Sequence, residues 1–105
     1  ASVPAPITPP ASERFEAVDG GIGRACRGQT AADNSKTYYT VMSAASVDDC
    51  KAQCEGAPGC KGIEYNGKSR CEVWTRGAGI GATIAVPGYM CLGYLGSSNS
   101  NRFEA

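Results

Sequence analysis

Apolar and polar residues alternate most regularly between residues 61 and 75. Two short alternating segments, 61–65 and 70–75, flank the pair Asn66-Gly67, which is typical of tight turns between antiparallel strands. The pattern therefore predicts a β-hairpin. Because successive strand side chains point to opposite faces, the two faces should differ. The apolar face would carry Ile63, Tyr65, Cys71 and Val73, and the outward face Glu64, Glu72 and Trp74.

The segment 47–54 predicts a helix with marked ends. Ser46 is a natural N-cap, two aspartates follow in the first turn, where the helix dipole favours negative charge, and Gly56 provides a stop. Cys50 and Cys54 are four residues apart, so both sulfurs leave one helical face, which we expect to pack on the sheet. Short strands are predicted at 38–42 and 89–92, with a flexible Gly- and Ala-rich loop at 77–86. The fold class is α+β, one helix packed on a small antiparallel sheet.

The two ends of the chain read differently from its middle. Residues 1–13 are rich in proline and predict an extended arm or linker, 14–95 a single folded domain, and 96–105 a linker-like tail. The tetrapeptide Arg-Phe-Glu-Ala at 14–17 recurs at 102–105. That recurrence is either a coincidence or the start of a second repeat in a tandem array.

Composition narrows the function classes. The chain has 105 residues, ten basic and ten acidic side chains and no histidine. Balanced charge argues against nucleic-acid binding, and no apolar run is long enough to predict a transmembrane segment. Six cysteines in so short a chain indicate disulfides and an oxidising compartment, extracellular or luminal, rather than the reducing cytosol. In a reducing compartment they would instead be metal ligands, but no C-x-x-C pair is present.

The cysteine spacing suggests how the sulfurs pair. Cys26 and Cys91 bracket the folded region, Cys50 would tie the helix to Cys71 in the hairpin, and Cys54 with Cys60 would close a short loop. The run from 46 to 75, SVDDCKAQCEGAPGCKGIEYNGKSRCEVWT, resembles the centre of a PAN/apple domain. It is particularly similar to the tandem PAN-type repeats of some unicellular algae. The resemblance covers roughly 26–91 and implies the same three pairs.

Catalysis is not expected. Without histidine there is no Ser-His or Cys-His pair, and bridged cysteines leave no thiolate. Glu64 and Glu72 could mimic a glycosidase pair, but they read more simply as solvated strand residues. No cofactor is implied, and no metal site is expected, since the Asp33-Asn34-Ser35 segment offers one carboxylate and reads as a turn.

Binding remains, with two interpretations. A sugar site would use Trp74 as a platform with Glu72, Glu64 and Arg76, helped by Tyr38 and Tyr39; alternatively Trp74 simply covers a thin core. A protein-contact surface would use the arms, Phe15, Trp74 and the 77–86 loop with Ile80 and Ile84; that loop either packs on the core or serves as a contact surface.

The sequence favours a non-catalytic, disulfide-stapled protein-interaction module. We expect an accessory subunit that contacts other protein subunits, with an algal thylakoid lumen as one version. The alternative is a secreted lectin-like repeat that binds glycans.

Overall fold

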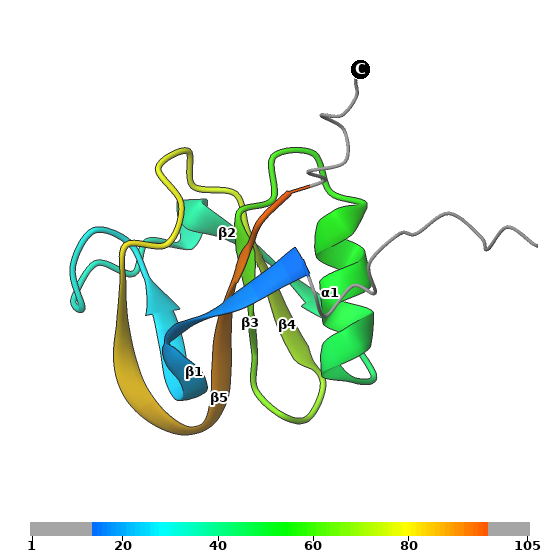
Figure 1. Cartoon of the computed structure of the whole chain (residues 1–105), viewed down its shortest axis with the longest axis horizontal. Coiled ribbons are helices and arrows are strands. Elements are labelled where there is room, and N and C mark those ends of the chain that lie inside the picture. Colours follow the sequence, from blue (N-terminus) through cyan, green and yellow to red (C-terminus); the bar gives the residue numbers. More distant parts are fainter. Residues whose placement is uncertain (1–13, 97–105) are drawn as a thin grey trace, which may run out of the picture.

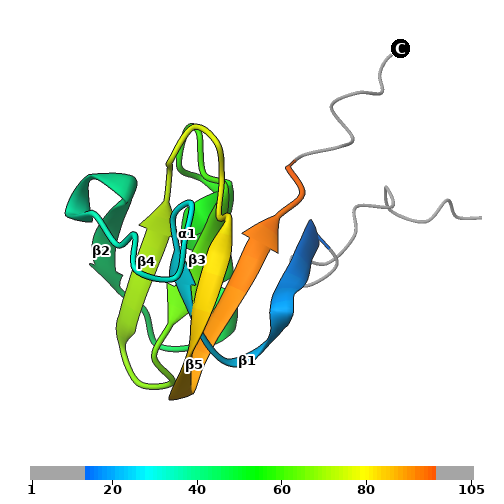
Figure 2. The same cartoon turned by 90° about the vertical axis from the view of Figure 1, so that its left-hand side faces the viewer.

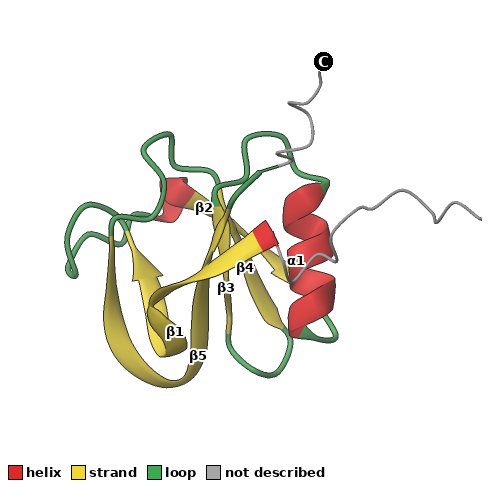
Figure 3. Ribbon diagram, viewed as in Figure 1, coloured by secondary structure: helices red, strands yellow, loops and turns green. Residues whose placement is uncertain are grey.

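The protein is described by a computed structural model that covers residues 14–96, so both predicted arms, 1–13 and most of 96–105, lie outside the described residues. Within them, five strands form one antiparallel sheet in the order β1-β5-β3-β4-β2, with helix α1 against one face (Figures 1 and 3). This confirms the α+β prediction. The elements are β1 (Phe15–Arg27), the 3₁₀ turn η2 (Lys36–Tyr38), β2 (Tyr39–Ser43), α1 (Val47–Glu55), β3 (Gly62–Tyr65), β4 (Arg70–Trp74) and β5 (Ala82–Tyr94).

The predicted hairpin is the centre of the sheet. β3 and β4 pair so that Ile63 lies opposite Val73 and Glu64 opposite Glu72. Asn66 organises the connection, since its Oδ1 accepts hydrogen bonds from three successive backbone N–H groups, those of residues 68, 69 and 70, at 2.9–3.1 Å. Gly67 has φ +82°, a conformation that favours glycine. The sequence-based interpretation of this turn is confirmed.

The helix has the predicted ends and packs on the apolar face of the hairpin. Ser46 Oγ accepts a hydrogen bond from the Asp49 N–H at 3.1 Å, and Gly56 ends the helix by donating to Ala52. Its buried side chains are Cys50, Lys51 and Cys54, a single stripe, as expected for a nine-residue helix that covers one sheet face. The resulting core contains Phe15, Ala44, Cys50, Cys54, Cys60, Ile63, Tyr65, Cys71 and Val73.

The largest difference from the sequence-based prediction lies in the two outer strands. β1 was not predicted, and β5 begins at Ala82 rather than Tyr89, so residues 82–86 of the expected 77–86 loop are strand. Arg24–Arg27 pair with residues 82–85, whereas Phe15–Ala17 pair with 92–94. Both strands bend sharply between these halves, at Asp19–Gly23 in β1 and near Pro87-Gly88 in β5 (Figures 1 and 2). The glycines and the proline that permit the bend also hide the strand signal.

Because the two outer strands bend, their far halves cover the sheet face opposite the helix. A second cluster forms there from Trp74 and the Cys26–Cys91 bridge, with Val18, Tyr38, Tyr39 and Ile80 packed against it. Trp74 is 0% exposed. The expectation that Trp74 lies on an open outward face is therefore wrong, and the alternative that it covers a thin core is confirmed: strand alternation was right, but the face is covered. Ile80, expected on a contact surface, packs against this cluster.

Phe15 is also internal rather than a contact residue. Its ring is 4.9 Å from that of Tyr94 and lies under the Lys51 ammonium group, 5.8 Å from the ring centroid. Arg14 adds an ion pair to Glu55 of the helix, with Nη1 and Oε2 3.7 Å apart. The Arg-Phe-Glu-Ala segment at 14–17 therefore starts β1 and fastens it to the helix side. Its second copy, at 102–105, lies outside the described residues.

Three disulfides join Cys26 to Cys91, Cys50 to Cys71 and Cys54 to Cys60, which confirms the predicted pairs. All six sulfurs are bridged. The first bridge fastens β1 to β5, the second joins the helix to β4, and the third closes the turn after the helix. In the described part of the chain, the single short helix is far from the length needed to cross a bilayer.

Replacing both cysteines of one disulfide by alanine should lower the unfolding free energy by an amount that increases with the length of the loop that the disulfide closes. The Cys26–Cys91 bridge closes 65 residues and the Cys54–Cys60 bridge only six. Loop-closure entropy predicts losses of about 4 and about 2 kcal/mol of unfolding free energy, respectively. Chemical denaturation of the two double variants measures both values. A larger loss for the short loop would contradict this ranking.

Candidate functional site

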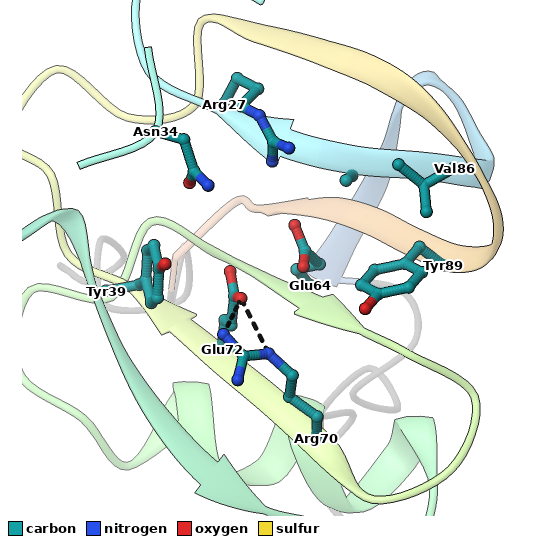
Figure 4. Close-up of a pocket in the computed structure, with 9 residues that line it drawn as sticks. Arg27, Asn34, Tyr39, Glu64, Arg70, Glu72, Val86 and Tyr89 are labelled. Atoms are coloured by element: carbon teal, nitrogen blue, oxygen red, sulfur yellow. Dashed lines mark hydrogen bonds and ion pairs between the residues drawn. The ribbon is translucent and has the colours of Figure 1, made fainter. Parts of the chain in front are cut away.

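A polar recess of about 340 Å³ opens on the sheet face opposite the helix (Figure 4). Strands β1, β2, β3, β4 and β5 all contribute to it, because the bent outer strands fold toward the hairpin. Two glutamates lie in its interior, two arginines and an asparagine line it with polar groups, and two tyrosine rings flank it. The lining residues are Ala25, Arg27, Asn34, Tyr39, Glu64, Arg70, Glu72, Val86 and Tyr89.

Glu72 is held firmly in place. Arg70 donates two hydrogen bonds to its Oε2, from Nε at 3.1 Å and Nη2 at 2.7 Å. The buried Trp74 donates from Nε1 to its Oε1 at 3.1 Å. Both carboxylate oxygens are therefore engaged, Oε2 by the Arg70 guanidinium and Oε1 by the Trp74 indole N–H. Trp74 thus supports the pocket from beneath through its indole N–H, instead of providing an exposed stacking surface.

Glu64 has a different environment. Its Oε1 accepts a hydrogen bond from the Cys26 backbone N–H at 2.7 Å, and only 4% of the residue is exposed. Burial, together with the negative charge of Glu72 directly opposite on β4, raises the pKa of Glu64 to about 7. The Cys26 N–H and the positive charge of Arg27 act in the opposite direction and only partly offset this. The earlier interpretation of the two glutamates as solvated strand residues is wrong.

The rings of Tyr39 and Tyr89 lie on opposite sides of the two carboxyl groups (Figure 4). Tyr39 packs against Trp74, with ring centroids 5.2 Å apart, and both tyrosines are half-buried. Arg27 reaches toward Glu64 from β1 (Figure 4) and donates from Nη1 to the Cys26 carbonyl at 2.7 Å. The recess therefore combines aromatic faces with fixed acceptors and donors.

The structure brings together only part of the residue set predicted from the sequence. Glu64, Glu72 and Tyr39 line the recess. Arg76 lies elsewhere: it stacks over Tyr38 at 5.3 Å and donates to the Gly79 carbonyl. Tyr38 donates to the Asp33 carboxylate, whose pKa is lowered by the Gln29 N–H and by this hydroxyl. Ile84 is a half-buried residue of β5.

Sequence reasoning missed Arg27, Asn34, Arg70, Val86 and Tyr89. Arg70 carried a usable signal, because it lies two residues before Glu72 on the same strand and so projects from the same face. The others belong to β1, β5 and the loop before η2, and reach the recess only because the outer strands bend. In the described part of the chain, no group of three acidic, histidine or cysteine side chains is placed to hold a metal ion.

The fold and the site together define the class of protein: an α+β domain held by disulfides, with a polar recess on one face of its sheet. The family model of the PAN domain matches residues 26–94, well over half of the chain, and the chain belongs to that family. No curated protein and no solved structure matches it. PAN domains are generally non-catalytic modules that contact proteins or carbohydrates. Membership and the three bridges fit an extracellular or otherwise oxidising compartment.

Folding stability should depend on pH through Glu64. Its pKa is raised from 4.5 to about 7 in the folded chain, so the folded state keeps a proton that the unfolded state releases. This stabilisation is complete below pH 4.5 and is lost as the pH rises through 7, by up to about 3 kcal/mol. No histidine titrates in this range to obscure the effect. Urea unfolding at pH 5 and pH 8 measures it.

Glu64→Gln should abolish most of that difference, because the amide keeps an acceptor for the Cys26 N–H but does not ionise. Glu16→Gln is the matched control: Glu16 is an exposed residue of β1, and its variant should keep the wild-type pH dependence. A wild-type chain that is equally stable at pH 5 and pH 8 would contradict the assignment.

Proposed function

We propose that this PAN domain binds carbohydrate in the recess around Glu64 and Glu72. The observation that carries the proposal is the placement of two tyrosine rings on opposite sides of buried, oriented carboxyl groups (Figure 4). A sugar presents apolar C–H faces and a rim of hydroxyls, so it needs aromatic surfaces and fixed hydrogen-bonding groups together. Recesses that combine apolar surface with a few convergent polar groups are the usual form of a small-ligand site.

The charge balance of the recess supports an uncharged ligand. Once Glu64 is ionised, above its pKa of about 7, the two acidic side chains of the recess balance its two arginines in charge. Arg70 is already committed to Glu72, and Arg27 to the Cys26 carbonyl. An anionic ligand would compete with Glu72 for Arg70, whereas a cation would meet two guanidinium groups. A neutral sugar avoids both costs and can use the remaining donors and acceptors.

A non-catalytic role is supported by the state of Glu72. Glycosidase chemistry with two carboxyl groups needs the second one free to act as a nucleophile or a base. Both oxygens of Glu72 are occupied, by Arg70 and Trp74. The pair therefore suits recognition better than hydrolysis.

The protein-contact interpretation now depends on other surfaces. Phe15 and Trp74 are buried, and Ile80 is half-buried, where it packs against the Trp74 cluster and lines a second recess beside β1 with the neighbouring residues 78 and 79. Among the described residues, the large apolar side chains that stay exposed are Ile22, Val41 and Leu95. An accessory-subunit role, in a thylakoid lumen or elsewhere, stays a prediction that rests chiefly on the arms.

Tyr89→Ala should abolish binding of neutral methyl glycosides while leaving the melting temperature unchanged, because Tyr89 lines the recess without belonging to either core cluster. We expect at least a tenfold loss of affinity, measured by ligand-observed NMR with a panel of methyl glycosides of glucose, galactose, mannose and N-acetylglucosamine. Tyr89→Phe retains the ring and should retain most of the binding. Leu95→Ala, at an exposed position just after β5, is the surface control.

If Tyr89→Ala binds as the wild type does, the recess is not the sugar site. Trp74→Ala would not test the recess, because removing a fully buried tryptophan costs about 3–5 kcal/mol and disrupts the fold.

Deleting residues 1–13 tests the accessory-subunit alternative. If the arm docks on other subunits, the native chain should co-purify with a stable complex and the truncated chain should not, with the melting temperature of the domain unchanged. Equal co-purification of both forms would remove the arm from consideration.

A further inference from the structure

The arrangement around Glu64 points to regulation of the proposed sugar site, and this inference rests on that proposed function. We propose that a bound neutral sugar favours loss of the proton held by Glu64, so that binding is coupled to proton release and strengthens as the pH rises through neutrality.

The two glutamates cannot both be ionised without cost. They face each other directly across the β3–β4 pair, and each is 4% exposed. Of the two, Glu72 has both carboxyl oxygens engaged by donors, Arg70 and the Trp74 N–H, whereas Glu64 accepts from one backbone N–H. Like charges placed opposite each other in a buried site repel, so the proton resides on Glu64. This asymmetry depends on geometry: one carboxyl has a guanidinium partner, and the other has a single backbone N–H.

Every element packed around Glu64 contributes to this balance. From β4, Glu72 and Arg70 face Glu64, and Arg27 faces it from β1. The phenols of Tyr39 and Tyr89 face it from β2 and β5. The loop before η2 adds only the uncharged Asn34. Arg27 is the one cation that acts on Glu64 without being paired to Glu72, and it lowers the pKa of Glu64. In the free site, a modest additional interaction with the ionised carboxylate is therefore enough to make Glu64 release its proton.

A sugar supplies that interaction. Two of its hydroxyls can donate to an ionised carboxylate, and hydrogen bonds to a charged acceptor are roughly twice as strong as neutral ones. The sugar keeps its own hydroxyl protons, the Glu64 O–H bond breaks, and the proton leaves to solvent. An acidic sugar would behave in the opposite way, since its charge is tolerated best when Glu64 is protonated. The direction of the pH dependence thus identifies the ligand class.

The test is NMR on the intact chain carrying ¹³C-labelled glutamate, with the neutral methyl glycosides as probes. The Glu64 side-chain carbonyl shift is followed against pH, alone and at saturating sugar. We expect saturation to lower the titration midpoint by about one pH unit, and affinity to rise about sevenfold between pH 5.5 and pH 8. Glu64→Gln should bind equally at both pH values, whereas Glu16→Gln should behave as the wild type.

The outcomes separate the two proposals. Binding of a neutral sugar with an unchanged Glu64 midpoint, or tighter binding at low pH, would overturn the proton release while leaving the sugar site in place. Tight binding of glucuronic acid at low pH, in preference to the neutral glycosides, would overturn the neutral-ligand assignment. Failure of every sugar at every pH would overturn the proposed function and this inference together. Because the midpoint is read on the wild-type chain, misfolding of the glutamine variant does not remove the test.

Discussion

The junction between Cys26, Cys91 and Glu64 is the constraint on which the rest of the structure depends. The Cys26–Cys91 bridge joins β1 to β5, and the Cys26 N–H donates to Glu64 on β3 at 2.7 Å. These two links hold the folded-over halves of the outer strands against the central hairpin. The face that they cover carries Trp74, which is 0% exposed.

This junction explains how so small a domain has two buried layers. The helix covers one face through Cys50 and Cys54, each bridged to a neighbouring segment. The outer strands cover the other face and bury Trp74 completely. Cross-links replace the thick hydrophobic interior that a chain of this length cannot build. The recess forms where the second cover ends, and most of the side chains that line it are polar or aromatic.

The central elements were predictable because their signals are local. Ser46, Gly56 and the Asn66-Gly67 turn act within a few residues of themselves, and the structure has the helix and hairpin where those residues predict them. The opposing glutamates also follow from alternation along one hairpin. By contrast, β1 and the early half of β5 have broken patterns, because Asp19–Gly23 and Pro87-Gly88 interrupt the alternation where the strands bend. Sequence reasoning therefore treated residues 82–86 as loop and did not detect β1.

Local sequence signals determined the helix, the hairpin and the dependence of the fold on disulfides. They also determined that two acidic side chains, one on each strand of the hairpin, share one face of the sheet. Only the tertiary structure decided that this face is covered, that Trp74 and Phe15 are core residues, and that Arg27 and Tyr89 meet Glu64. The reason is physical: whether a strand face is wet or buried depends on segments distant in sequence. The burial of Glu64, and with it the raised pKa, comes from strands whose own residues carry no sign of where they will fold.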